Sequence, residues 1–409
     1  MSYFGQTKAQ DETLKVLSYN LLNYPNPAIP VDFRADTLKK IIDYYTPDLF
    51  IMQELKSSSG FSTILNSAFN TNGVDYYETA TWEPQHSNPG SSWKLQQNVI
   101  YNSQKLAISY ETFLWTTRRD INVFKFYFKD PNLENHQDTT YLYVLALHLK
   151  SSQGADNEAQ RLSMVQILEN FLDTISPNAQ VIVGGDYNVY TSAEAAYQLM
   201  LNTSNNIILA DPVNTPGNWH NNSSFRFVHT QSTRTAPING DGAGGGMDDR
   251  FDFVMVSENL MDQNNAISVI ENTYEPLGNN GNCFNARIID CEDNDVPASV
   301  INALYQMSDH IPVKMELSID YPIFNSITGQ QYDYAIKIIN QNSERLLFSI
   351  SNYKKPVNYT IISISGKVLV KETSAASNTT SIALSNLSNG VYFLLFEDAS
   401  IEPYKFVKY

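Results

Sequence analysis

The chain has 409 residues, of which 42% are apolar and 12% aromatic, and its formal net charge is −16. This composition is typical of a folded, strand-rich protein and excludes disorder of the whole chain. The acidic excess also excludes a protein that merely coats nucleic acid or anionic lipid by long-range attraction. An enzyme that reaches phosphates through a bound metal ion is not excluded, because a cation reverses the local field.

Apolar runs of strand type alternate with amphipathic helical runs between residues 13 and 318. The predicted strands are 14–19, 48–53, 97–101, 106–115, 122–128, 141–148, 180–185, 251–257 and 311–317. The predicted helices are 33–45, capped by Asp32, and then 157–173, 193–201 and 298–307. Many strands with few helices predict an α/β fold, a four-layer α/β sandwich of two packed, mostly antiparallel sheets flanked by helices.

The composition changes after Asp320. Residues 321–409 carry 8 basic and 6 acidic side chains, whereas the rest of the chain carries 19 and 37. Short apolar runs separated by Ser-Asn-Gly turns predict a small all-β sandwich there. We therefore expect a main domain at 13–318, a linker at 319–331 and a C-terminal β-sandwich at 332–409.

The two cysteines, Cys283 and Cys291, lie eight residues apart in a polar stretch. Two thiols alone cannot form a structural zinc site, and this spacing is not that of a redox pair. A local disulfide would suit an exported protein. A pair of free thiols fits the sequence equally well.

Several polar side chains stand where the predicted strands begin or end. Singly, most have an ordinary interpretation as a turn, cap or core residue, whereas Asp252 lies inside a predicted strand and needs a partner. Strand ends at one edge of a sandwich share a cleft, however, so together these side chains predict one site. They are Asn20, Glu54, His148, Asp186, Asn188, Asp252, Asp309 and His310.

The chemistry of this set points to a metal ion. Carboxylates and amides without cysteine form a hard, oxygen-rich site that suits Mg²⁺ or Mn²⁺ better than zinc. Two histidines near such a cation can neutralise an oxyanion or move a proton. The reaction class that uses this mixture is metal-assisted hydrolysis of a phosphate ester.

Six fragments spanning residues 13–318 resemble, in their order, the endonuclease/exonuclease/phosphatase superfamily. This family includes deoxyribonuclease I, abasic-site endonucleases, bacterial sphingomyelinases and inositol polyphosphate phosphatases. The fragments are Leu17-Ser18-Tyr19-Asn20, Gln53-Glu54, Leu147-His148-Leu149-Lys150-Ser151, Gly185-Asp186-Tyr187-Asn188, Phe251-Asp252-Phe253 and Ser308-Asp309-His310.

The resemblance implies a bound Mg²⁺, with Mn²⁺ as a possible substitute. Glu54 would be the principal metal ligand, and Asn20 and Asp309 would adjoin it. Asp186 would orient or deprotonate the attacking water, and Asn188 would hold that water or a phosphate oxygen.

The resemblance also implies that His148 and His310 contact the phosphate from two sides, with Asp252 orienting His310. Whether Asp186 or His310 takes the proton stays open. In the deoxyribonuclease I branch a glutamate supports the first histidine, whereas the strand at 97–101 here begins with Gln97 and Asn98 and carries no carboxylate.

The tail resembles a type IX secretion C-terminal sorting domain of Bacteroidetes-type bacteria. The resemblance lies in residues 365–368, 387–394 and 405–408. It implies a secreted or cell-surface protein with the type IX secretion machinery as a partner. Such export also needs a signal peptide, so we expect the true start to lie upstream of Met1. No run of 18 apolar residues occurs, so no membrane-spanning helix is expected.

The sequence therefore predicts a secreted, monomeric, metal-dependent phosphodiesterase, most simply a nuclease of low sequence specificity with nucleic acid as substrate. A sphingomyelinase-like or other phosphoesterase is the alternative within the same class. A catalytically silent surface-binding module is the alternative from another class. A silent relative would be expected to lose ligands, and here every predicted position is filled.

Overall fold

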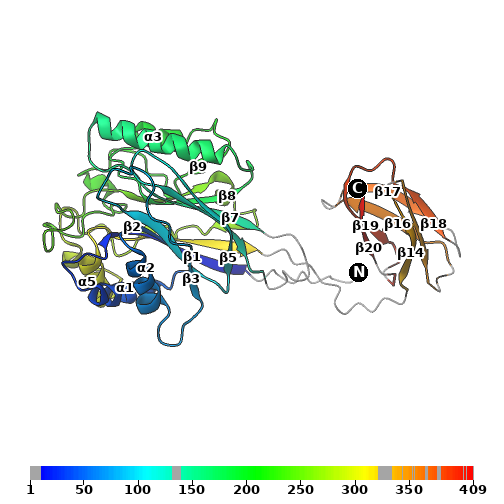
Figure 1. Ribbon diagram of the computed structural model, residues 1–409, viewed down its shortest axis with the longest axis horizontal. Helices are drawn as coiled ribbons and strands as arrows, with labels where there is room; N and C mark the ends of the chain where they lie inside the picture. The colour runs from blue at the N-terminus through cyan, green and yellow to red at the C-terminus, as the bar shows by residue number, and fades with distance from the viewer. Residues whose placement is uncertain are drawn as a thin grey trace. The chain divides into compact units, whose positions relative to one another are not determined.

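The computed structural model describes residues 11–130, 140–320 and most of 334–408, the exceptions being 343, 352, 354, 364–366, 375–378, 399 and 402. These residues form two compact units, one on each side of residues 321–333 (Figure 1). The predicted bounds at 13–318, 319–331 and 332–409 stay predictions, and most of the predicted linker lies outside the described residues.

The first unit contains two mixed sheets. The first sheet has the strand order β11-β13-β1-β2-β4-β3, with β12 also paired to β13. Its strands are β1 (Asp11–Tyr24), β2 (Leu49–Leu55), β3 (Tyr77–Thr79), β4 (Gln96–Asn102), β11 (Ile267–Val269), β12 (Glu275–Pro276) and β13 (Val313–Asp320). Only β1 and β2 pair in parallel in this sheet.

The second sheet has the order β5-β6-β7-β8-β10-β9. Its strands are β5 (Leu106–Leu114), β6 (Ile121–Phe128), β7 (Tyr141–His148), β8 (Gln180–Asp186), β9 (Leu209–Ala210) and β10 (Asp252–Ser257). The β7–β8 pair is parallel and the other pairs are antiparallel. The predicted sandwich of mostly antiparallel sheets is confirmed.

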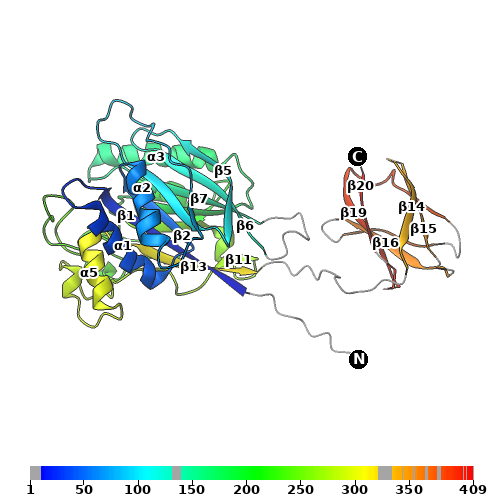
Figure 2. The ribbon, with the colours of Figure 1, turned by 60° about the horizontal axis from the view of Figure 1, so that its bottom comes forward.

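Helices cover the outer faces of both sheets. Helix α3 (Ala155–Leu172) lies on one side, whereas α1 (Val31–Tyr45), α2 (Ser58–Ile64) and α5 (Ala298–Met307) lie on the opposite side (Figures 1 and 2). The short α4 (Ala195–Met200) shares a core with α3 and the second sheet. A period of two along each strand sends alternate side chains to opposite faces, which makes the four layers possible.

Three cores follow from that alternation. Val16, Ile51 and Val144 belong to the core that contains residues of both sheets. The outer face of the first sheet packs with α1 and α5, and that of the second sheet with α3 and α4. In β7, β8 and β10, every second residue faces the inner core. These three series of inward-facing residues end at the same edge of the sheet. This edge carries the predicted site.

The structure corrects one local expectation, the helix cap, and decides one open alternative, the pairing of the cysteines. Helix α1 begins at Val31 after Pro30, so Asp32 lies in the first turn and is not the N-cap. Pro30 is the N-cap and makes no side-chain capping hydrogen bond. Cys283 and Cys291 form a disulfide, which settles the alternative that the sequence left open. None of the described helices is both long and apolar enough to cross a membrane.

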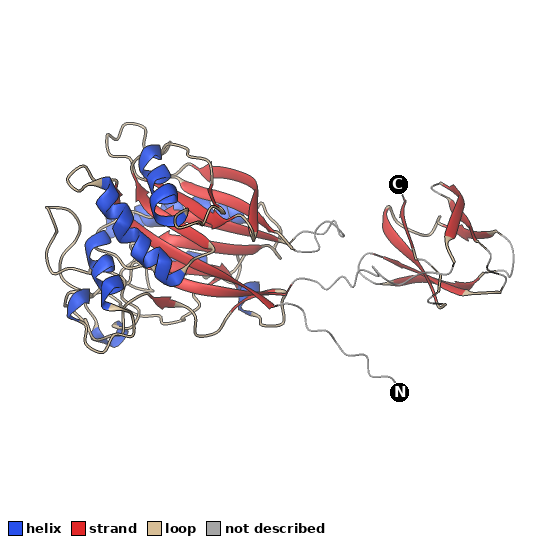
Figure 3. Cartoon of the chain, turned by 90° about the horizontal axis from the view of Figure 1, so that it is seen from below, coloured by secondary structure: helices blue, strands red, loops and turns tan. Residues whose placement is uncertain are grey.

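In the C-terminal unit, the described regular elements are strands (Figure 3). One sheet contains β14 (Ile336–Gln341), β15 (Arg345–Ile350) and β18 (Thr380–Ala383). The other contains β17 (Val368–Thr373), β16 (Asn358–Ser363), β19 (Gly390–Phe396) and β20 (Tyr404–Lys408). Phe348 of the first sheet and Ile361 and Phe406 of the second share one core, so the predicted small all-β sandwich is confirmed.

Helix α3 contains a buried carboxylate that should make stability depend on pH. Glu169 is 7% exposed, and Asn205 Nδ2 donates to its Oε2 at 2.8 Å. Burial, with a smaller contribution from Asp173, raises the pKa of Glu169 to about 8. The folded state therefore holds this proton more tightly than the unfolded state, and stability falls as the pH rises from about 4.3 to about 8.

We expect Glu169→Gln to raise the unfolding free energy at pH 8 by about 2 kcal/mol and to change it much less at pH 5. Denaturant unfolding at both pH values measures this difference. The exposed Glu158→Gln on the same helix is the control and should stay within about 0.5 kcal/mol at both. Equal effects of Glu169→Gln at the two pH values would contradict the predicted proton uptake.

Candidate active site

Three of the predicted residues form a row across the second sheet. His148 ends β7 and pairs with Asp186 at the end of β8, and Asp186 pairs with Asp252 at the start of β10. Side chains of directly paired residues point to the same face. All three are less than 3% exposed, so one imidazole and two carboxylates are buried side by side at this edge.

The first sheet contributes Asn20 and Glu54 from two adjacent strands. Asn20 of β1 pairs with Gln53 of β2, so strict alternation would turn Glu54 to the other face. Glu54 instead has a φ of +64°, and the β2–β4 register shifts between Met52 and Leu55. Such an irregularity re-aims a side chain and is frequent beside active sites. It brings Glu54 toward Asn20.

Asp186 is the centre of the group. Asn20 Nδ2 donates to Asp186 Oδ2 at 3.0 Å and to Glu54 Oε1 at 3.1 Å. The same Asp186 oxygen lies 3.4 Å from His148 Nε2 and 3.8 Å from His310 Nε2. Five side chains that are up to 290 residues apart in sequence therefore meet within hydrogen-bond or ion-pair range.

The two histidines have opposite electrostatic surroundings. Burial would lower the pKa of His310, but the carboxylates of Asp252, 2.7 Å from its Nδ1, and of Asp186 outweigh that effect and raise the pKa well above the ordinary value. Burial and the Arg119 charge hold the pKa of His148 well below its ordinary value. The pKa values of the two imidazoles are therefore shifted in opposite directions, which favours the cationic form of His310 and the neutral form of His148.

The support of His148 differs from that in the deoxyribonuclease I branch. Gln97 Nε2 donates to the backbone oxygen of Asp120 at 2.7 Å. His148 Nδ1 has no hydrogen-bond partner among the described residues. Arg119 Nη1 instead donates to the backbone oxygens of His148 at 3.4 Å and Leu149 at 3.0 Å. The strand end is thus held through its main chain.

The remaining predicted residues flank this centre. The Asn188 backbone N–H donates to Asp186 Oδ1 at 3.0 Å, while its side-chain amide donates to Leu149 O at 3.4 Å. Asp309 Oδ2 accepts from the backbone N–H of Ala243 at 2.6 Å. All eight predicted residues therefore lie in or beside one buried polar cluster, although their individual roles stay predictions.

The donor set fits a hard divalent cation. Burial raises the pKa of Glu54, with the Asp309 charge as the next contribution, and burial raises that of Asp186 to about 7. One ligand atom each from Glu54, His148 and Asp186 lie within 4.8 Å of one another. Crowded, buried carboxylates are stabilised in the ionised form by a bound cation, and oxygen donors suit Mg²⁺ or Mn²⁺. Asn20 Oδ1, however, accepts from Leu22 N at 3.0 Å, so its nitrogen faces the carboxylates.

Gln231 belongs to the cluster and was missed in the sequence. Its Nε2 lies 2.6 Å from His310 Nε2 and 3.3 Å from Asp309 Oδ2. It lies in a long segment between β9 and β10 without strand periodicity, so no sequence signal marked it. Arg119 was noticed as part of a basic cluster, but a solvated surface explained that cluster equally well.

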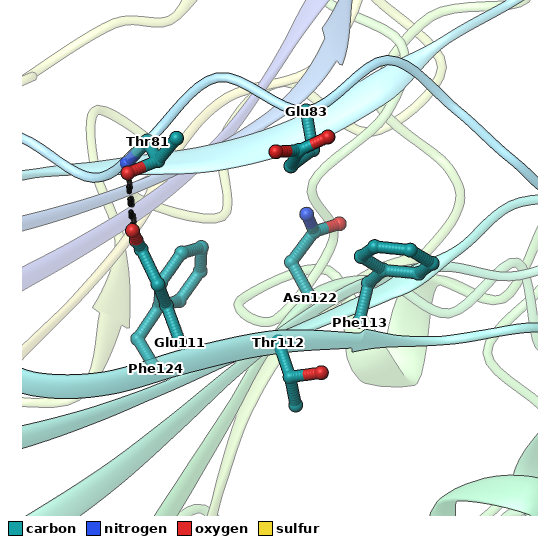
Figure 4. A pocket seen from close by; sticks show the side chains of 7 residues that line it. All are labelled: Thr81, Glu83, Glu111, Thr112, Phe113, Asn122 and Phe124. Carbon is teal, nitrogen blue, oxygen red and sulfur yellow. Dashed lines mark hydrogen bonds between the residues drawn. The ribbon is translucent and has the colours of Figure 1, made fainter.

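A separate cavity lies away from these residues. A cavity of ≈ 290 Å³ opens between residues 81–83 and the β5–β6 hairpin, and Asn122 points into it opposite Glu83 (Figure 4). Thr81 hydrogen-bonds Glu111 at its rim. None of the eight predicted residues lines it. The chemistry of its residues, and not the size of a cavity, therefore identifies the candidate active site.

Comparison with known families identifies the C-terminal unit. Residues 342–407 match the family described as the secretion system C-terminal sorting domain. The predicted type IX sorting domain is confirmed, and the protein is a secreted or cell-surface protein. Among curated proteins, no sequence matches this chain.

The chain also resembles solved structures of endonuclease/exonuclease/phosphatase proteins. One is a family protein from Bacteroides thetaiotaomicron, 15% identical, covering 76% of this chain and 100% of its own, with a TM-score of 0.46. The human nocturnin catalytic domain with bound sulfate is 16% identical, covering 76% and 98%, with a TM-score of 0.46. D. rerio TDP2 complexed with single-strand DNA product is 14% identical, covering 75% and 99%, with a TM-score of 0.47. At these identities the resemblance assigns no activity.

The glycine before Asp186 should be essential to this geometry. A Cβ on Gly185, whose φ is +157°, would lie 2.0 Å from the backbone oxygen of Leu147. We expect Gly185→Ala to separate β7 from β8 and lower the unfolding free energy by about 2 kcal/mol, measured by denaturant unfolding. Gly90→Ala, where a Cβ meets nothing within 4 Å, is the control. Equal stability of the two variants would contradict this packing argument.

Proposed function

We propose that this secreted protein is a divalent-metal-dependent hydrolase of phosphodiester bonds, and specifically a nuclease of low sequence specificity. One observation carries the proposal. Asp186 Oδ2 is approached by Asn20, His148 and His310 at 3.0, 3.4 and 3.8 Å, and Glu54 shares the same Asn20 amide. Acids, amides and two histidines in one largely buried cluster are the mixture that metal-assisted phosphate hydrolysis requires.

In this proposal Glu54, with Asn20 and Asp309 beside it, holds Mg²⁺ or Mn²⁺. For Asn20 this requires its amide oxygen to turn from Leu22 toward the cation. The bound cation neutralises charge on the phosphate and polarises its phosphorus–oxygen bonds. Burial of the site strengthens every such electrostatic interaction, because water does not screen it.

The different pKa values of the side chains support separate roles. Asp186, with a pKa of about 7, is suited to accept the proton of the attacking water near neutral pH. His310, kept cationic by Asp252, is suited to stabilise the negative charge that develops on the phosphate. His148, kept neutral, lies beside the Glu54 and Asp186 oxygens and is suited to donate a hydrogen bond from that side. Asn188 fixes Asp186 through its backbone.

The surface supports a nuclease over a sphingomyelinase-like enzyme. A lipid hydrolase needs an exposed apolar loop that enters the membrane interface. In residues 270–300, all of them described, no large hydrophobic side chain is exposed. This segment therefore offers no such loop from its own side chains.

A metal screen of the purified protein tests the proposal directly. Plasmid DNA, RNA, sphingomyelin and a small phosphodiester are each incubated with Mg²⁺, with Mn²⁺ and with chelator. We expect chelator-sensitive cutting of DNA or RNA. Cleavage of lipid alone would reject the nuclease, and folded protein that cleaves none of the four would favour the silent binding module.

Substitutions of the two residues with opposite proposed charges test the mechanism. We expect Asp186→Ala and His310→Ala each to lower turnover by at least about 100-fold, with folding measured in parallel by circular dichroism. Asp43→Ala on the exposed side of α1 is the control and should keep full turnover. Turnover within a few-fold of the parent for a folded Asp186→Ala would reject this assignment.

The metal ligand is tested separately. Glu54→Gln keeps the size of the side chain but removes its charge and one of its two acceptor oxygens, which accept from Asn20 and Asn23. We therefore expect the metal concentration for half-maximal turnover to rise at least about tenfold. Titration of turnover with Mg²⁺ measures the shift. An unchanged midpoint would mean that Glu54 is not a ligand.

A further inference from the structure

A pocket beside His148 is not used by the proposed chemistry. It has a volume of ≈ 170 Å³ and is walled by three segments that are distant in sequence. These are the β3–β4 connection with Trp93, the β5–β6 turn with Arg118 and Arg119, and Lys150 and Ser151 directly after β7. Because Lys150 follows His148 by two residues, the pocket adjoins the candidate active site.

The positive charges of this pocket form no direct ion pair among the described residues, although Glu54 and Asp186 of the candidate active site attract Arg119. Arg118, Arg119 and Lys150 form no ion pair with a carboxylate in the described part of the chain, although the whole chain has a net charge of −16. Their donated hydrogen bonds go to neutral groups: Arg118 to Gln160, and Lys150 Nζ to Ser151 O at 2.6 Å. Burial and then the neighbouring arginine charges lower the pKa of Lys150. Three crowded cations are repulsive until an anion enters between them.

Trp93 contributes a flat aromatic surface to the lining of this pocket. The Trp93 side chain is 58% exposed, and Lys56 Nζ lies 4.1 Å from the centre of its ring. An indole face is large enough to stack a nucleobase. An aromatic plane and a cluster of cations in one pocket match the two parts of a nucleotide.

We propose that this pocket is a subsite for one nucleotide of a single-stranded nucleic acid, whose phosphate lies at Arg118 and Lys150 and whose base stacks on Trp93. The inference rests on the proposed function and names its substrate class. The scissile phosphate lies at Asp186 and the histidines, and the neighbouring nucleotide of the same strand occupies the pocket. A base stacked on a protein side chain has left its helix, so the subsite selects single strands over duplexes.

Binding measured without hydrolysis tests the subsite. A fluorescent 15-nucleotide oligodeoxythymidylate is titrated with the full-length protein in EDTA, and anisotropy gives the dissociation constant. We expect Trp93→Ala to weaken binding about tenfold and Trp93→Phe to restore most of it, because stacking needs a ring and not indole specifically. Arg118→Gln should lower the slope of log affinity against log salt by about 0.7.

A matched control exists at the other end of β7. Tyr141 is also exposed and also has a lysine, Lys125, 4.1 Å from its ring centre, but it begins the strand that His148 ends. Tyr141→Ala should leave binding unchanged. Unaltered affinity of Trp93→Ala, equal weakening by Tyr141→Ala, or tighter binding of a duplex than of the single strand would each overturn the proposal.

Turnover separates this proposal from the proposed function. With metal present, Trp93→Ala should raise KM for the oligonucleotide about tenfold, keep kcat, and leave hydrolysis of bis(4-nitrophenyl) phosphate unchanged, because that ester lacks a second nucleotide. Equal losses on both substrates would overturn the subsite while leaving the hydrolase intact. If binding still depended on Trp93 but no substrate were turned over, the hydrolase would be rejected and the subsite supported.

Discussion

The side-chain amide of Asn20 is the contact on which the rest of the candidate site depends. Its nitrogen donates to Glu54 of its own sheet at 3.1 Å and to Asp186 of the opposite sheet at 3.0 Å. A link this short requires two sheets that approach closely at their edge. Gly184 permits that approach, because a Cβ there would lie 2.7 Å from Ile51 Cδ1 of the facing sheet. Two buried carboxylates are thereby kept close together despite their repulsion.

That enforced proximity sets the protonation of the whole cluster. Burial and then neighbouring carboxylates raise the pKa of both Glu54 and Asp186, and the carboxylates of Asp252 and Asp186 raise the pKa of His310. His148 lies 3.4 Å from the same Asp186 oxygen, but burial and then the Arg119 charge lower its pKa. Neighbouring groups whose environments separate their pKa values are suited to different steps of one reaction. The acidic net charge of the chain does not conflict with an anionic substrate, because the local field at this edge is set by nearby cations and by any bound metal.

Much of this could be predicted from the amino-acid sequence. Period-two apolar runs predicted the strands, and the order of short polar fragments at their ends predicted that Asn20, His148, Asp186 and Asp252 share one edge. Residue chemistry alone indicated a hard cation, since carboxylates and amides were present and cysteine was absent. The turn-rich tail predicted the second β-unit, and the resemblance of three of its fragments to a sorting domain predicted its sorting role, which the family match at residues 342–407 confirms. These conclusions depend on local pattern, which a single sequence contains.

The tertiary structure decided those contacts that a local sequence pattern cannot predict. Alternation would turn Glu54 away from Asn20, and only a bulged backbone with a φ of +64° brings it in. Gln231 reaches His310 from a segment without periodicity, and Arg119 changes from a surface cation to a support of His148 only when β6 and β7 are paired. The disulfide between Cys283 and Cys291 likewise required their positions. The sequence by itself determined which chemical groups stand at the strand ends; how those groups meet was decided by irregular backbone and by contacts between distant segments, for which no repeating pattern exists.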